Sequence, residues 1–130
     1  MRREDARRIT ERGSAAVEFA LTVPIALLVL AAILRVGLVA RDRLVLAEAA
    51  RAGAREAAVT ADADAIRAAV TGAAAGLDPA RLSIVVARAG GVGQPVRVDL
   101  VYDEVLGAGF DLLPTDVTLT ASASMRQEFG

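Results

Sequence analysis

A single apolar run limits what this chain can fold into. From residue 14 to residue 34 the sequence consists mainly of Ala, Val, Leu and Ile, and Glu18 is the one ionisable side chain in it. As a helix rising about 1.5 Å per residue, the run matches a membrane hydrocarbon core of about 30 Å. We therefore expect residues 14–34 to span a membrane. The free-energy cost of removing the Glu18 carboxylate from water must then be offset by a partner group or serve a function.

The charges flanking the run indicate its orientation. Residues 1–13 (MRREDARRITERG) are strongly polar, contain more arginines than acidic residues and end in Gly13. A basic N-terminal flank favours a cytoplasmic N-terminus, although Arg35, Arg41 and Arg43 on the other side reduce the asymmetry. We expect residues 1–13 to be a short cytoplasmic leader and the chain beyond the span to lie outside.

The helical pattern outlasts the apolar run. Residues 14–59 are rich in helix formers, and a helix of that length is far longer than a bilayer requires, so its second half must leave the membrane. Pro24 removes one helical hydrogen bond and predicts a bend at this position. In the second half, Ala49, Gly53 and Ala57 share one face, a spacing that permits close helix packing but also arises by chance in Ala-rich sequence.

The remaining residues, 60–130, are expected to form a small α+β domain. The stretch TADAD at residues 60–64 supplies N-cap candidates for a second helix, which runs to about residue 75 and ends at Gly76. Three segments with alternating apolar and polar residues then predict β-strands. These strands are expected at residues 83–88, 96–102 and 117–125.

The alternation and the connections predict how the strands are arranged. In residues 117–125 apolar side chains alternate with Thr and Ser, which predicts a sheet with one buried face and one hydrated face. Residues 89–95 (AGGVGQP) are typical of a hairpin connection. Residues 103–116 predict a longer loop with apolar residues that pack over the sheet edge. The whole chain is thus expected to be α+β, with a long N-terminal helix, a short second helix and a three-stranded antiparallel sheet.

Composition excludes several classes of function. The sequence has no His and no Cys, so the usual general base, thiolate nucleophile and metal ligands are missing. The formal net charge is -1, with one Tyr, three Phe and no Trp, which provides neither a cationic face nor a stacking platform for nucleic acid. We expect no enzymatic activity, no cofactor, no metal ion, no nucleic acid and no small-molecule substrate.

The acidic residues of the C-terminal half do not change this expectation. Four of them lack the spacing of a calcium loop and are expected to be solvated loop charges: Asp99, Asp103, Glu104 and Asp111. Tyr102, at a predicted strand end, is expected to be a core or edge residue.

The features around the apolar run combine into a known pattern. A basic leader that ends in Gly13, a small residue, Glu18 and then a long apolar helix resemble the class III signal of type IV pilin-like proteins. The resemblance implies that a prepilin peptidase cuts between Gly13 and Ser14. It also implies that Glu18 is an assembly contact, which meets the N-terminal amine of a neighbouring subunit. Such a contact would offset the cost of about 2.5 kcal/mol for a carboxylate at membrane depth.

The resemblance narrows to one family. The run RGSAAVEFALTVPIALLVL, the small residues near Gly53 and the ending SMRQE are similar to the TadE family of pseudopilins from the tight-adherence (Flp) pilus system. Major Flp pilins are much shorter and lack a sheet domain, so the resemblance implies a minor subunit. The implied partners are a prepilin peptidase, other pilin subunits, the pilus assembly machinery and membrane lipid. The implied location is the bacterial cytoplasmic membrane, with a single pass, an outer C-terminal domain and incorporation into a surface pilus.

Two other interpretations fit the same residues. An uncleaved single-pass anchor would hold an accessory domain that binds an envelope partner. A conventionally secreted protein would lose the apolar run by cleavage near Ala40. In either case Gly13 is an ordinary flexible residue, and Glu18 is a carboxylate at the membrane interface if residues 21–40 do the spanning.

Overall fold

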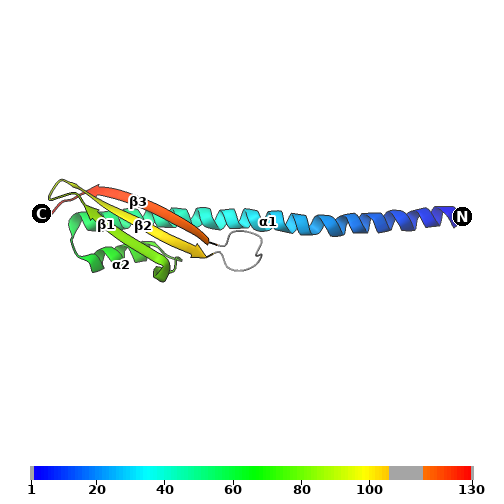
Figure 1. Ribbon diagram of the computed structural model, residues 1–130, viewed down its shortest axis with the longest axis horizontal. Helices are drawn as coiled ribbons and strands as arrows, with labels where there is room; N and C mark the ends of the chain where they lie inside the picture. The colour runs from blue at the N-terminus through cyan, green and yellow to red at the C-terminus, as the bar shows by residue number, and fades with distance from the viewer. Residues whose placement is uncertain (1, 106–115, 130) are drawn as a thin grey trace. The chain divides into compact units, whose positions relative to one another are not determined.

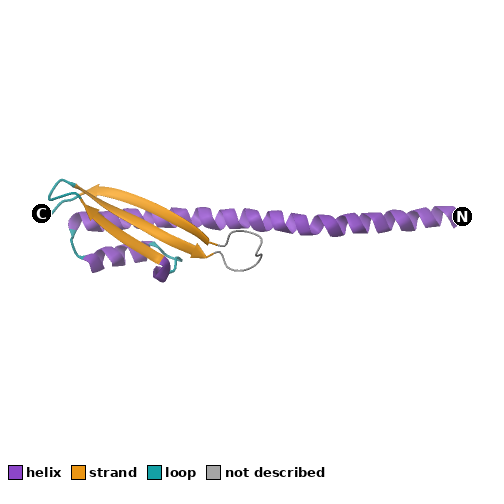
Figure 2. Ribbon diagram, viewed as in Figure 1, coloured by secondary structure: helices purple, strands orange, loops and turns teal. Residues whose placement is uncertain are grey.

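The computed structural model describes residues 2–105 and 116–129, with side chains for residues 16–104 and 116–129. Two helices come first, α1 (Arg2–Val59) and α2 (Ala63–Ala73), followed by a short 3-10 helix, η1 (Pro79–Arg81). The strands are β1 (Leu82–Arg88), β2 (Pro95–Val105) and β3 (Asp116–Arg126) (Figure 1). This arrangement confirms the predicted α+β class, with a long N-terminal helix, a second short helix and a three-stranded antiparallel sheet (Figure 2).

Two compact units divide the chain, and α1 contributes to both of them. The first unit is Met1–Val39 and the second is Ala40–Gly130. The sequence predicts a division at residue 59, where α1 ends. The second compact unit includes the last part of α1, because the side chains of that part are buried among those of the following elements.

The first unit is helical from Arg2 onward, so the helix begins well before the start at about residue 15 that the sequence predicts. It continues without interruption through Pro24. Most of its large apolar side chains are more than two-fifths exposed, among them Phe19, Leu21 and Ile33. A helix with apolar side chains on all sides is typical of a segment that lies in lipid.

In the second unit, α1 has one buried face. The buried residues recur every three or four positions, which places them on one side of the helix. They are mostly Ala, so the helix backbone comes close to its neighbours: Leu46, Ala49, Ala50, Gly53, Ala54, Ala57 and Ala58.

The sheet has the strand order β1-β2-β3, and each neighbouring pair is antiparallel. Leu100 lies opposite Ile84 on one side and Ala121 on the other, which places these three residues on the face that packs against the helices. In β3, exposed residues alternate with half-buried and buried ones, as predicted. Val98, Leu100 and Leu119 form the centre of the core.

The connections set the limits of the smaller elements. The side chain of Asp62 caps α2 by accepting a hydrogen bond from the Asp64 amide at 2.9 Å, and Gly76 takes a positive φ of 91° just after the helix, as its predicted end requires. β1 and β2 form the predicted hairpin. β2 runs to Val105, so Asp103 and Glu104 lie in a strand and not in the loop predicted there. Asp111 lies outside the described residues.

Candidate functional site

Glu18 is the charged residue of the apolar part of α1. Its side chain is exposed, and Thr22 Oγ1 donates a hydrogen bond to the Glu18 carbonyl oxygen at 2.8 Å, one helical turn away. Between Ala16 and Leu34 every other described side chain is uncharged. Glu18 is therefore an isolated carboxylate on a helix surface that is otherwise apolar.

The predicted cleavage point lies one turn before Glu18. Gly13 and Ser14 are both part of α1, so the peptide bond between them belongs to a continuous helix. Positions four apart share a face of a helix, which puts Ser14 and Glu18 on the same side. A peptidase that cuts between Gly13 and Ser14 must first unwind this helical turn, because a peptide bond within a helix is not in an extended conformation.

The small residues of the second half of α1 lie inside the domain. Ala49, Gly53 and Ala57 are fully or almost fully buried. A Cβ atom added at Gly53 would lie 2.5 Å from Val70 Cγ2 in α2 and 3.3 Å from Val98 Cγ1 in β2. The structure thus places this stripe against the chain's own second helix and sheet, where Gly53 permits a close approach.

The N-terminal helix carries the signal that relates this chain to known proteins. In the part of the chain that the structure describes, α1 is the helix long and apolar enough to cross a membrane, over Ala16–Val59. Residues 13–55 match the family model described as TadE-like protein. This segment is TadE-like. The resemblance drawn from the sequence is therefore confirmed for these residues, whereas searches of the curated proteins and of the solved structures found no match.

The TadE-like segment and its composition support a coarse assignment. The family match covers the apolar part of α1, and that helix fits a single-pass membrane anchor. The match begins at Gly13 and includes Glu18 as well as Ala49 and Gly53 of the buried stripe. The match ends before α2 and the sheet, so the site residues beyond residue 55 are argued from the geometry of the structure alone.

A pair of carboxyl groups lies just beyond the apolar part of the TadE-like segment. Asp42 in α1 is buried, and Arg41 Nη1 lies 3.8 Å from its Oδ1. Glu104 in β2 is half-buried, and its Oε2 is enclosed without a hydrogen-bond partner among the described residues. Burial raises the pKa of Glu104 above its ordinary value of 4.5, the nearby Asp42 carboxyl raises it further, and Arg81 opposes the shift.

This pair has fewer ligands than a metal site built from acidic side chains normally uses. Metal sites of this kind need several acidic, His or Cys ligands, and the described residues bring no three of them together. Sequence reasoning missed the pairing because Asp42 and Glu104 are far apart in the chain, and Asp42 has the pattern of an ordinary charge on an exposed helix.

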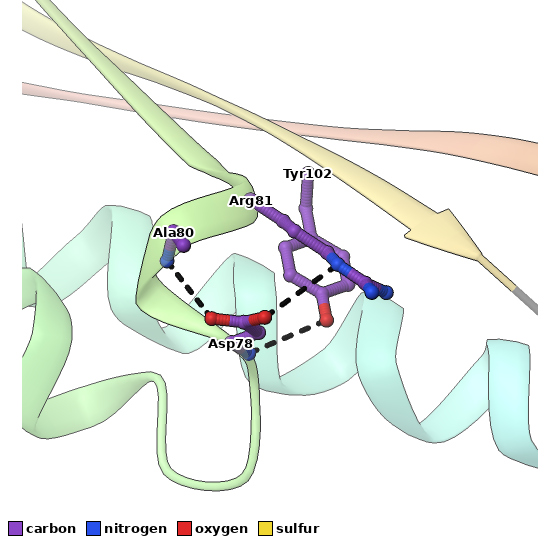
Figure 3. Close-up of polar contacts among 4 residues, drawn as sticks. All are labelled: Asp78, Ala80, Arg81 and Tyr102. Carbon is purple, nitrogen blue, oxygen red and sulfur yellow. Dashed lines mark hydrogen bonds and ion pairs between the residues drawn. The ribbon is translucent and has the colours of Figure 1, made fainter.

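A polar cluster fixes the turn that leads into β1 (Figure 3). Asp78 Oδ1 accepts a hydrogen bond from the Ala80 amide at 3.0 Å, and its Oδ2 lies 3.5 Å from Arg81 Nε. The Asp78 amide donates to the Tyr102 hydroxyl at 3.3 Å, which joins the turn to β2. Tyr102 is buried, which confirms its predicted place in the core. These contacts tie the turn before β1 to β2.

Arg88 closes the far end of α1 and was also missed by sequence reasoning. Its guanidinium donates to the carbonyl oxygens of Ala57 at 2.8 Å and Thr60 at 2.9 Å. The same group lies over the ring of Phe129, 5.3 Å from the centroid. A cation at a helix C-terminus satisfies free carbonyl groups and opposes the helix dipole. Arg88 thus joins β1, α1 and the segment after β3.

Proposed function

We propose that this chain is a minor pseudopilin of a tight-adherence (Flp) pilus. In this proposal a prepilin peptidase cuts after Gly13 and the protein assembles through its N-terminal helix. The observation that carries the proposal is the lone carboxylate of Glu18 on an uncharged helix surface, one turn after Ser14 and within the TadE-like segment. The role is structural and involves no catalysis by this chain.

The chemistry of cleavage accounts for the position of Glu18. Cutting between Gly13 and Ser14 converts the backbone nitrogen of Ser14 into an amine that is mostly protonated at neutral pH. A carboxylate at membrane depth costs about 2.5 kcal/mol or more when it is unpaired. A neighbouring subunit's new amine removes that cost for Glu18, so the processed form favours side-by-side packing of helices and the uncut form does not.

The proposed location follows from the two units. The apolar unit is the membrane anchor, with its basic N-terminal flank on the cytoplasmic side. The second unit then lies outside, where the absence of Cys makes it indifferent to an oxidising environment.

The first test is the N-terminus and intact mass of the membrane-extracted protein, with and without a co-expressed prepilin peptidase. The proposal requires a start at Ser14 that depends on the peptidase. A start at Met1 in both samples would instead indicate an uncleaved anchor with an accessory domain. A start near Arg41 would indicate a conventionally secreted protein.

The second test separates insertion from assembly. We expect Glu18→Ala to insert into the membrane and to be cleaved normally, but to enter pili at a much lower level than the unchanged protein. Glu48→Ala is the matched control, because Glu48 is an exposed carboxylate of the same helix, paired with Arg51 at 2.9 Å outside the apolar part. Equal incorporation of both variants would contradict the role assigned to Glu18.

A further inference from the structure

The outer edge of β1 has free backbone groups. β1 is an end strand of the sheet, so one of its edges has no neighbour. The Ala89 amide donates to the Pro95 carbonyl at 3.2 Å, which fixes the side of the chain that faces β2. Because hydrogen-bonded pairs alternate along an antiparallel ladder, Ile84 and Val86 turn their N–H and C=O groups away from β2. Nothing in the described part of the chain pairs with these groups.

The side chains of this edge do not protect it. Residues 82–87 (LSIVVA) contain no charge and no proline, and Val85 at the centre is 56% exposed. Natural sheets normally place charges, prolines or bulges on a free edge, because an apolar edge pairs with other strands. β3, the opposite edge strand, also lacks charge and proline over residues 117–125, but its exposed side chains are hydroxyl-bearing, such as Thr118 and Thr120, where β1 exposes Val85. The β1 edge therefore has the features of a pairing surface.

A groove runs beside the same edge, between β1 and the first half of α2. Its volume is about 170 Å³, and one side is open. Ile84 and Val86 contribute their side chains to its wall and their free backbone groups to its rim. The lining residues are Ala61, Ala63, Ile66, Arg67, Ile84, Val86 and Arg88. A strand paired with β1 would place alternate side chains in this groove.

The widths of the two layers indicate what fits there. The second part of α1 and α2 are in close contact at Gly53 and Val70, and two packed helices with axes 8–10 Å apart cover about 20 Å. Three strands at a spacing of about 4.8 Å cover only about 14 Å. The helix layer is thus wider than the sheet by about one strand, on the side of the groove. A second copy would bring its own helices against α2, so the space suits one extended segment.

The charges around the groove indicate the chemistry of that segment. Arg67 is exposed and forms no ion pair within the described residues, and Arg88 is the other cation of the lining. Asp62 and Asp64 stand near the start of α2, but they are not part of the lining, and Asp62 is engaged in capping the helix. A partner carboxylate near Arg67 would therefore meet a positive rim.

We propose that the groove between β1 and α2 binds an extended peptide segment of another protein, which adds a fourth strand to the sheet. The segment has apolar side chains at alternate positions, which enter the groove, and a carboxylate beside Arg67. This is strand addition at a sheet edge, in which main-chain hydrogen bonds give affinity and the groove gives specificity. It does not depend on cleavage at Gly13, so its test and that of the pilin role can fail separately.

The probe is a fluorescent eight-residue peptide of alternating Val and Thr with one terminal Glu, titrated against the full chain in detergent micelles by anisotropy. Val86→Pro removes an outward N–H without touching the ladder to β2, and proline is tolerated at such edge positions. Losing that hydrogen bond and the wall contact of the Val86 side chain should weaken binding by about tenfold or more. Thr120→Pro is the matched control, because it makes the same change on the outer edge of β3, and its affinity should equal that of the unchanged chain.

A charge exchange tests the orientation of the segment. Arg67→Glu should weaken binding of the Glu peptide by about threefold, as for an exposed ion pair, and improve binding of the same peptide with Lys in place of Glu. The fluorescence of Tyr102 establishes in each case that the domain is folded. Absence of saturable binding, equal loss in both proline variants, or loss confined to Thr120→Pro would overturn the proposal. Self-association through β1 in place of peptide binding would also overturn it.

Discussion

Adding one methyl group at Gly53 tests the closest packing in the domain. In Gly53→Ala the new Cβ would lie 2.5 Å from Val70 Cγ2 and 3.3 Å from Val98 Cγ1, whereas carbon atoms in good contact are about 3.5–4.0 Å apart. Both valines are fully buried and β-branched, so neither can turn aside easily. α2 or the sheet must move, at a cost of about 1–3 kcal/mol for overpacking. Clashes on two sides favour the upper part of that range.

A gain in helix propensity opposes this cost. Replacing Gly by Ala inside a helix stabilises by about 1 kcal/mol, so the net loss for Gly53→Ala should be about 1–2 kcal/mol. Gly72→Ala in α2 is the matched control, because a Cβ there has no other atom within 4 Å. It should be neutral or stabilise the domain by up to about 1 kcal/mol. The difference between the two variants isolates the packing cost, since both share the effect of Gly on the unfolded chain.

The measurement is urea unfolding of the full chain in detergent micelles, followed by tyrosine fluorescence. Tyr102 is the only tyrosine and there is no Trp. The residue is 6% exposed in the domain, so its fluorescence reports the unfolding of that unit. Equal midpoints for Gly53→Ala and Gly72→Ala would refute the close approach of α1, α2 and β2. A double variant with Val70→Ala should lose less than the sum of the single changes, because the clashing methyl groups are gone.

Three further changes probe the contacts that sequence reasoning missed or only outlined. Because the pKa of Glu104 is raised above 4.5, its contribution to stability is fully present below that value and is lost as pH rises through the shifted pKa. Glu104→Gln should therefore be more stable than the unchanged chain at about pH 7, and its urea midpoint should vary less between about pH 4 and pH 8. Parallel pH profiles for the two proteins would contradict this. Arg88→Met should lower the free energy of unfolding, measured in urea, by about 2 kcal/mol, because two charged hydrogen bonds at the end of α1 are lost. Arg88→Lys should be more stable than Arg88→Met but less stable than the unchanged chain. Asp62→Ala should cost about 1 kcal/mol and Asp62→Asn almost nothing, since only the latter can cap α2; equal losses in thermal unfolding would argue against the cap.

Local patterns were sufficient to predict the elements. The alternation of Val117, Leu119 and Ala121 with hydroxyl residues predicts the buried face of β3, and the structure confirms it. Capping and turn residues locate α2 within two residues or so of its ends. These signals work because the side-chain period and the cap geometry are properties of short segments, which the rest of the fold does not have to supply.

Contacts between distant residues could not be predicted in the same way. Asp42 and Glu104 belong to an early helix and a later strand, and only the packing of β2 on α1 brings their carboxyl groups together. Arg88 has the sequence position of a strand-end charge, yet it closes a helix whose end lies far away in the chain. The small-residue stripe at Gly53 indicated close packing, but not that α2 and β2 supply the packing surface.

The two edge strands of the sheet, β1 and β3, differ in their surroundings. A groove borders β1, whereas β3 carries exposed Ser and Thr side chains on the face of the sheet that points away from the helices. A unit that extends a sheet indefinitely needs two complementary edges, because each added strand must leave a new place for the next. Strand addition at β1, as proposed, would attach one neighbour to this domain. Under the two proposals together, repetition along an assembly would come from the apolar helix, and the sheet would mark where one neighbour attaches.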